Sequence, residues 1–249
     1  MKFKPLKAIK VLFGQESSTQ PALGNDFEDI HKEIIAKVRP YTMTSAERLY
    51  GLIEAVKYVV KYNIPGDFVE CGVWKGGSMM AIAETLVKLG VTDRQLYLYD
   101  TFAGMTAPTK EDIDQLNRDA ATQLNQQSAQ KEESVVWAYS TLDEVKKNIS
   151  LINYPKNNIH FIEGDVLQTI PKIVPSQIAL LRLDTDWYES TKHEMEHLFP
   201  ILCTKGVLII DDYGFWKGSR KAVDEYIENN HVQILLNRMD ETGRIAIKL

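Results

Sequence analysis

The chain has 249 residues, enough for one large α/β domain, and its 44% apolar and 25% charged residues are usual for a soluble globular protein. The formal net charge of −5, without a basic run, gives no electrostatic reason to bind nucleic acid. No stretch resembles a transmembrane helix or a signal peptide, so we expect a cytoplasmic protein with no membrane partner, whose two cysteines are buried thiols.

Residues 1–40 have weak periodicity and are interpreted as an N-terminal extension, with a helix over Phe27–Val38 that ends before Pro40. The sequence Thr44-Ser-Ala-Glu47 matches a capping box and predicts the start of a second helix. Apolar residues recur at helical spacing as far as Val60, and a first strand is expected after the following Pro-Gly pair.

A short apolar strand, a glycine-rich bend and a helix are predicted over residues 67–78. Such bends bind nucleotide-like ligands, because backbone groups can approach the ligand closely. Glu70 ends the strand, where its carboxylate would repel a pyrophosphate and suit an ammonium group, and the spacing Glu-x-Gly-x-x-x-Gly-Gly departs from the dinucleotide fingerprint. We therefore predict a site for S-adenosylmethionine (SAM), which carries an ammonium and a sulfonium; the alternative is a tight turn whose glycines serve geometry alone.

The second predicted strand, Leu96–Tyr99, ends at Asp100, an acidic residue placed to accept hydrogen bonds from ribose hydroxyls. Residues 106–139 are polar, with little strand signal, and are interpreted as an inserted helical segment. This segment is either a lid over the site or a solvated helical hairpin. A further capping box, Thr141–Glu144, predicts a helix that continues to Ile149.

The rest of the chain alternates strands with helices. The pattern predicts a single α/β domain over residues 1–249, with a mostly parallel sheet and helices on both faces. The expected strands are Ile159–Glu163, Ile178–Leu183, Gly206–Ile210 and an antiparallel hairpin of Val232–Leu236 with Arg244–Lys248; the expected helices are Tyr188–Phe199 and Ser219–Asn229.

Acidic residues follow the fourth and fifth predicted strands. If these strands are neighbours, Asp184, Asp211 and Asp212 form a cluster of oxygen donors at one edge of the sheet. Clustered carboxylates repel one another, and a hard divalent cation such as magnesium or calcium would relieve that repulsion. The alternative is that these residues are helix caps and turn formers, where Asp is common.

The segment His193-Glu-Met-Glu-His197 matches the zinc-protease pattern on a helix. That helix runs away from the ligand-binding edge of the sheet, and no third ligand follows at a suitable spacing. Both histidines are therefore interpreted as helix-surface or packing residues.

Four motifs follow one another along the chain: Glu70–Ser78, Tyr99–Met105, Leu183–Ser190 and Asp211–Gly214. Together they resemble the macrocin O-methyltransferase family, whose members methylate macrolide sugars and the novobiocin sugar. The resemblance extends from about Tyr41 to the C-terminus. It implies a class I SAM-dependent methyltransferase with a Rossmann-like, seven-stranded sheet, and magnesium-dependent O-methylation in secondary-metabolite or saccharide tailoring.

The resemblance also implies roles for individual residues. Asp184, Asp211 and Asp212 would hold Mg²⁺, and Asp186 would act as the catalytic base. The residues implied around the cofactor are Thr42, Met43, Glu70, Gly72, Ser78, Asp100, Phe102 and Asp165.

The expected partner is a small-molecule hydroxylated acceptor, with a vicinal diol on a sugar as the leading candidate. A catechol-like aromatic diol needs the same metal chemistry, and a non-catalytic SAM- or nucleoside-binding module is a further alternative. A dinucleotide-dependent oxidoreductase is disfavoured by Glu70 and by the missing fingerprint. The sequence leaves room for a homo-oligomer.

Overall fold

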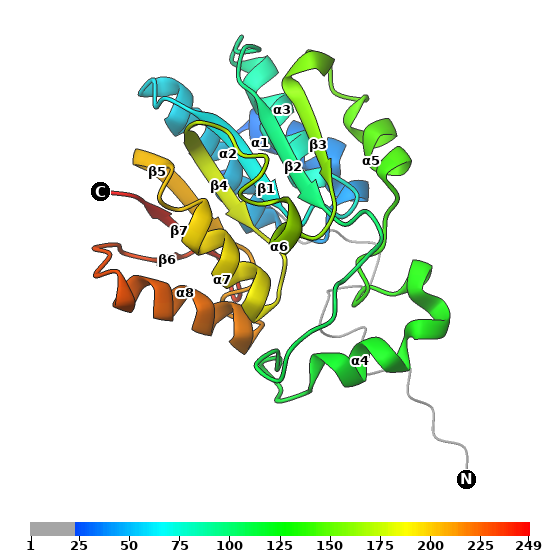
Figure 1. The fold of residues 1–249 in the computed structure, drawn as a ribbon. Helices are drawn as coiled ribbons and strands as arrows, with labels where there is room; N and C mark the ends of the chain where they lie inside the picture. Colours follow the sequence, from blue (N-terminus) through cyan, green and yellow to red (C-terminus); the bar gives the residue numbers. More distant parts are fainter. Residues whose placement is uncertain (1–22) are drawn as a thin grey trace.

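A seven-stranded sheet runs through the computed structural model, which describes residues 23–249; the earlier residues of the N-terminal extension lie outside the described part (Figure 1). The strand order is β3-β2-β1-β4-β5-β7-β6, and β1 to β5 are parallel while β7 is antiparallel to β5 and β6. This confirms the predicted α/β class and the seven strands. The strands are β1 (Asp67–Cys71), β2 (Leu96–Asp100), β3 (Ile159–Glu163), β4 (Ile178–Leu183), β5 (Leu202–Ile210), β6 (Asn237–Arg238) and β7 (Arg244–Ile247).

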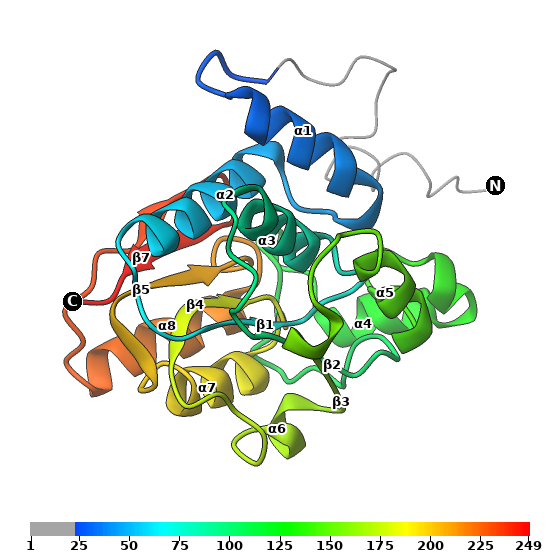
Figure 2. The same cartoon turned by 90° about the horizontal axis from the view of Figure 1, so that it is seen from above.

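Helices cover both faces of the sheet, as parallel strands require (Figure 2). Two hydrophobic cores result, one on each face. Cys71 and Cys203 are buried free thiols, as expected. One layer contains α1 (Asp29–Val38), α2 (Ala46–Lys61), α3 (Gly77–Lys88) and α5 (Leu142–Ile149), and the other contains α6 (Val166–Thr169), α7 (Tyr188–His197) and α8 (Lys217–Asn229).

The central strands β1, β4 and β5 bring the predicted acidic residues together. Every residue of β4 is buried, which fits its continuous apolar run at the middle of the sheet. Leu183, at the end of β4, pairs with Ile210 at the end of β5. Asp184 and Asp211 therefore leave adjacent strands at the same edge, as predicted.

Two boundaries differ from the sequence prediction. Helix α2 is capped by Ser45 rather than Thr44: the Ser45 hydroxyl accepts a hydrogen bond from the backbone N–H of Arg48. The expected strand Val232–Leu236 is wrong: this segment has no strand, and the partner of β7 on its outer side is the two-residue strand of Asn237 and Arg238. Its apolar residues still pack against the core beside α7 and α8. The alternating pattern of apolar residues therefore came from a half-buried chain segment that makes no strand hydrogen bonds to the sheet.

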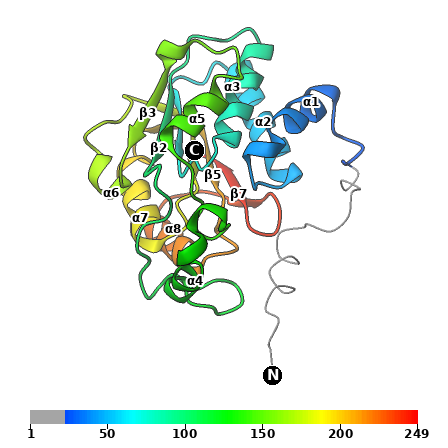
Figure 3. The ribbon, with the colours of Figure 1, turned by 90° about the vertical axis from the view of Figure 1, so that its right-hand side faces the viewer.

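The inserted segment 106–139 forms α4 (Ala120–Gln126) and a short 3₁₀ helix, η2 (Ser128–Glu133), joined by loops. It lies beyond the carboxyl ends of β2 and β3 (Figures 1 and 3). Ala120 and Leu124 pack against Trp187 and Trp216, and Asp114 forms an isolated bridge with Trp216. The insert is thus attached to the loops that follow β4 and β5. Two other 3₁₀ helices are η1 (Arg39–Tyr41) and η3 (Lys156–Asn158).

Within residues 23–249, no helix combines the length and the apolar content needed to cross a lipid bilayer.

Candidate active site

A cavity of about 580 Å³ opens at the carboxyl edge of β1, β2, β4 and β5, between the insert and the start of α2. Its volume lies within the usual range for small-molecule sites, and this edge is where open α/β sheets bind ligands. Glu70 and Phe102 are not among its lining residues. The predicted site residues that do line it are Thr42, Met43, Gly72, Ser78, Asp100, Asp165, Asp184, Asp186, Asp211 and Asp212.

Two positions in the bend after β1 require glycine, because other parts of the backbone lie very close to them. Gly72 has φ +82°, and a side chain there would overlap the carbonyl oxygen of Asp184. A Cβ at Gly77 would lie 2.5 Å from the carbonyl oxygen of Tyr41 and 2.6 Å from the Cβ of Thr42. The bend therefore packs against the loop after β4 on one side and against the segment before α2 on the other.

Asp100 is held rigidly at the end of β2. Its Oδ2 accepts hydrogen bonds from the backbone N–H groups of Val73 and Trp74 at 2.7 and 3.1 Å, and its Oδ1 accepts one from Phe102 at 2.7 Å. Burial nevertheless raises the pKa of the carboxyl. Phe102 itself is turned into the core, where its ring lies 6.5 Å from that of Phe161. The predicted ribose contact remains a prediction.

Glu70 forms an ion pair inside the sheet. Its Oε1 accepts a hydrogen bond from Nη1 of Arg182 at 2.7 Å, and both side chains are almost fully buried. Burial raises the pKa of Glu70 to about 7, although Arg182 acts in the opposite direction. Oε2 of Glu70 has no hydrogen-bond partner among the described residues. One oxygen is thus held by Arg182, while the other is buried without a partner and lies outside the cavity lining.

Two arginines occupy the carboxylate of Asp211. Nη2 of Arg182 donates to Oδ1 at 2.6 Å, and Nη1 of Arg48 pairs with Oδ2. Burial opposes ionisation, but the two guanidinium groups hold the pKa of Asp211 below its usual value. Arg48 also pairs with Asp240, in the turn between β6 and β7, at 2.9 Å. Asp211 is therefore an ionised anchor for two arginines as well as a cavity residue.

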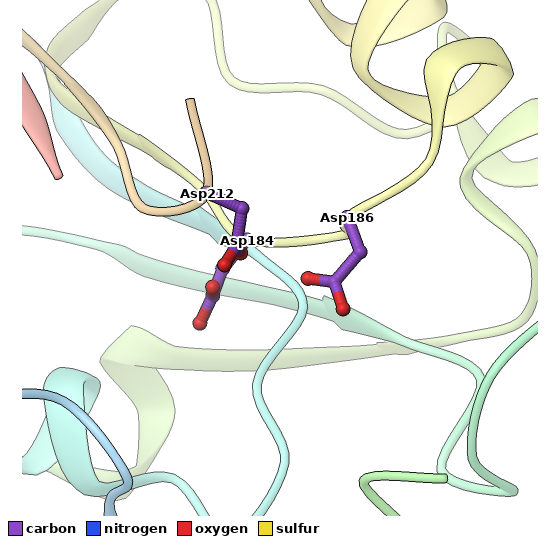
Figure 4. Close-up of side chains that lie close together, drawn as sticks. All are labelled: Asp184, Asp186 and Asp212. Carbon is purple, nitrogen blue, oxygen red and sulfur yellow. The ribbon is translucent and has the colours of Figure 1, made fainter. Parts of the chain in front are cut away.

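Three other aspartates converge on one point. One carboxylate oxygen from each of Asp184, Asp186 and Asp212 lies within 4.8 Å of the others, and the side chains face one another (Figure 4). Burial raises the pKa of each, and neighbouring carboxylates raise it further: to about 7 for Asp186, and well above its usual value for Asp184 and Asp212. An oxygen-only donor set with this repulsion fits a hard divalent cation such as Mg²⁺.

The third member of this trio differs from the sequence prediction, which placed Asp211 beside Asp184 and Asp212. In the structure, Asp186 takes that position. Asp186 adopts φ +69°, a left-handed conformation unusual for a non-glycine residue, and Nε1 of Trp216 donates to its Oδ2 at 3.2 Å. Strained backbone of this kind is concentrated at functional sites.

The insert gives the cavity a polar outer wall. Gln115, Arg118, Gln123 and Gln127 all line it. Nε of Arg118 is held at 2.6 Å by the fully buried carboxylate of Asp114. Amide and guanidinium groups bind hydroxylated ligands through hydrogen bonds, so this wall suits a polar acceptor.

The two histidines of the zinc-like pattern do not face the cavity. Nε2 of His193 contacts the carbonyl oxygen of Ile170 at 2.9 Å, and Nδ1 of His197 contacts that of His193 at 2.8 Å. Within residues 23–249, the acidic trio is the one group of side chains able to hold a metal ion. The histidines are packing residues, as interpreted.

Sequence reasoning missed Arg182 and Arg48. Arg182 had a usable signal: a single arginine in the apolar run Ile178–Leu183, where burial requires charged partners. Arg48 had none, because it lies in the first turns of α2 and reaches Asp211 from 163 positions away in the chain.

The chain is similar to known methyltransferases. A family model described as Macrocin-O-methyltransferase (TylF) matches residues 3–246. Demethyldecarbamoylnovobiocin O-methyltransferase of Streptomyces niveus is 31% identical over 203 residues, covering 82% of this chain and 74% of that protein. An enzyme of Streptomyces olivaceus, 8-demethyl-8-(2,3-dimethoxy-alpha-L-rhamnosyl)-tetracenomycin-C 4'-O-methyltransferase, is 29% identical over 230 residues, covering 92% and 80%.

The solved structure of the O-methyltransferase NovP is similar to this one, with a TM-score of 0.73 and 28% identity. The match covers 84% of this chain and 82% of that one.

Proposed function

We propose a function from the premise that this chain belongs to the macrocin O-methyltransferase family and is a SAM-dependent O-methyltransferase. It methylates one hydroxyl of a vicinal diol on a sugar, and a divalent cation binds at the acidic edge of the cavity. The observation that carries the proposal is the convergence of Asp184, Asp186 and Asp212 beside the glycine-rich bend. The two relatives named above are O-methyltransferases, and one is named for a rhamnosyl group.

The donor would lie along the bend. In SAM the methyl group is bonded to a sulfonium. As the acceptor oxygen forms the O–CH₃ bond, the S–CH₃ bond breaks and S-adenosylhomocysteine (SAH) is the leaving group. Gly72 and Ser78 line the cavity where the methionine part would lie. Glu70 would meet its ammonium only after its side chain turned the unpartnered, buried oxygen into the cavity. Thr42 and Met43 would cover it, while Asp100 and Asp165 would face the ribose and the adenine.

Asp184 and Asp212 would hold the cation, which supplies positive charge that lowers the pKa of a chelated hydroxyl. Asp186 would accept the proton from that hydroxyl, because its carboxylate oxygen lies within 4.8 Å of theirs. Asp211, the third ligand expected from the sequence, would instead fix Arg182 and Arg48 beside the ligands.

The polar wall of the insert would orient the acceptor. Bringing the hydroxyl and the methyl group into one fixed geometry contributes a large part of the rate of such a reaction. Gln115, Gln123 and Arg118 line the cavity and would donate hydrogen bonds to hydroxyl groups of a sugar.

The test combines titration with a transfer assay. The protein should bind SAM in a calorimetric titration, and should then transfer labelled methyl to some member of a panel of vicinal-diol sugars and catechols when Mg²⁺ is present. Excess chelator should stop transfer. Full activity in chelator would exclude metal assistance, and transfer to catechols alone would replace the sugar by an aromatic diol.

The roles of the aspartates separate in the same system. Asp212→Asn should lose cation binding and turnover together. Asp186→Asn should lose turnover while still binding both SAM and the cation. Loss of cation binding in Asp186→Asn would make this residue a ligand rather than the base.

A further inference from the structure

A fully buried carboxyl lies behind the loop after β4, which carries Asp184 and Asp186, and it has no role in the chemistry described so far. Glu194, on the sheet-facing side of α7, is 0% exposed. It belongs to the histidine-flanked pattern that resembled a zinc motif, but it points away from those histidines toward the loop after β4. Burying a carboxyl is unfavourable unless it is hydrogen-bonded, so its partners indicate what it does.

Its partner is the hydroxyl of Thr185. Oγ1 of Thr185 lies 2.9 Å from Oε1 and 3.1 Å from Oε2 of Glu194. Thr185 is the residue between Asp184 and Asp186, two members of the acidic trio. Cys71, the last residue of β1, is close enough for Glu194 to contribute to the raised pKa of its buried thiol. Glu194 thus joins α7 to the loop after β4 through the Thr185 hydroxyl.

Other contacts fix the backbone on either side of this hydroxyl. The N–H of Asp184 donates to the carbonyl oxygen of Cys71 at 2.8 Å, and the N–H of Trp187 donates to that of Thr185 at 2.8 Å. Between them, Asp186 is held at φ +69°. A left-handed aspartate persists only when its surroundings determine it. The Thr185 side chain ties this loop to α7 at 2.9 Å, and the Ser190 hydroxyl adds a longer bond to the Thr185 carbonyl oxygen at 3.4 Å.

We propose that Glu194 is a positioning residue, which holds the Thr185 hydroxyl so that the carboxylates of Asp184 and Asp186 face Asp212. The proposal rests on the proposed function, since it assigns Glu194 a part in forming the cation site and in aiming the base. Burial raises the pKa of Glu194 to about 8, so at neutral pH the group is mostly protonated and adds little negative charge behind the three aspartates. A hydrophobic residue here would pack without this burial penalty, but it would leave the loop without its anchor.

The experiment measures cation binding directly, by Mn²⁺ paramagnetic resonance on the whole protein in the presence of SAH. Thr185→Val and Glu194→Leu should each weaken Mn²⁺ binding by about 10- to 100-fold, the usual effect of losing an outer partner of a metal site. SAH binding should be unchanged. Thr185→Ser and Glu194→Gln keep a hydroxyl and an acceptor, and should bind Mn²⁺ close to the wild-type affinity.

Two further variants exclude a general loss of packing. Thr85→Val removes another buried threonine hydroxyl, which bonds to the Ala81 carbonyl in α3 at 2.7 Å, and should leave Mn²⁺ binding unchanged. The double variant Thr185→Val/Glu194→Leu should be no worse than either single variant, because both remove one contact. A folded Thr185→Val protein that binds Mn²⁺ like the wild type, or strictly additive losses, would overturn the proposal.

Failure of the proposed function would be distinguishable. If the wild type bound SAM and transferred methyl without any cation, the metal assignment would fall, and the same variants would be compared by kcat and KM. A lower kcat at constant KM for SAM, rescued by Thr185→Ser, would still support positioning of Asp186. A wild-type kcat in Thr185→Val would refute it.

Discussion

Replacing Arg182 by Met should destabilise the protein strongly. The side chain is 2% exposed, and it pairs at 2.6–2.7 Å with three carboxylates, those of Glu70, Asp184 and Asp211. Removing one partner of a buried ion pair leaves an uncompensated charge and typically costs about 3–5 kcal/mol. For a protein of this size, that loss corresponds to a fall in Tm of about 6–20 °C.

Thermal and urea unfolding at neutral pH would measure the change. Arg220→Met is the matched control, because Arg220 is 62% exposed and pairs with Asp224 on the surface of α8; its effect should stay within about 0.5 kcal/mol. Adding Glu70→Gln to Arg182→Met should restore part of the loss by removing one orphaned charge.

The deficit of Arg182→Met should also depend on pH. Burial already raises the folded-state pKa values of Glu70 and Asp184, and without the guanidinium they rise further, while Asp211 loses one of the two arginines that lower its pKa. The variant should therefore lose more stability than the wild type as pH rises, and recover it as these carboxyls protonate in acid. An Arg182→Met protein as stable as Arg220→Met at neutral pH would show that these carboxyls are not ionised in the native state, and would refute the electrostatic account.

Three further predictions concern the cavity edge. Gly72→Ala should lower stability and SAM affinity together, since a Cβ would overlap the carbonyl oxygen of Asp184. Gly90 also has a positive φ, +73°, but open space around it, so Gly90→Ala should show only the backbone strain of about 1–2 kcal/mol. Equal losses of stability for the two variants in calorimetry would refute the contact. Glu194→Gln should gain stability relative to wild type between pH 5 and pH 8.5, because the raised pKa of Glu194 gives stability that is lost as pH rises through about 8; a pH-independent difference in Tm would contradict this. Asp186→Asn should lower kcat by about 10²–10⁴-fold in the labelled-methyl assay, and a wild-type kcat would remove it as the base.

Much of the sheet could be predicted because its strands are short apolar runs closed by acids or glycine. Strands β3 and β4 have the predicted bounds, and β4 and β5 are neighbours, so Asp184 and Asp211 meet at one edge as expected. Strand ends are local in sequence, and the parallel arrangement brings them together without further information.

What could not be predicted depends on side chains that arrive from distant elements. Asp211 and Asp212 are adjacent and chemically identical, but Arg48 from α2 and Arg182 from β4 occupy the first, while the second is left facing Asp186. Likewise, the sequence around Glu194 did not predict its contact with Thr185. Helical spacing shows which residues share a face of the helix, but not which residue of another element they contact.

The turn between the last two strands carries Asp240, which accepts a hydrogen bond from the Ser45 cap of α2 at 2.6 Å and pairs with Arg48. The cavity is therefore closed by segments from opposite ends of the described chain. Proteolytic trimming from the carboxyl terminus would loosen the first turn of α2 once it passed this turn, and would damage ligand binding while the five parallel strands stayed intact.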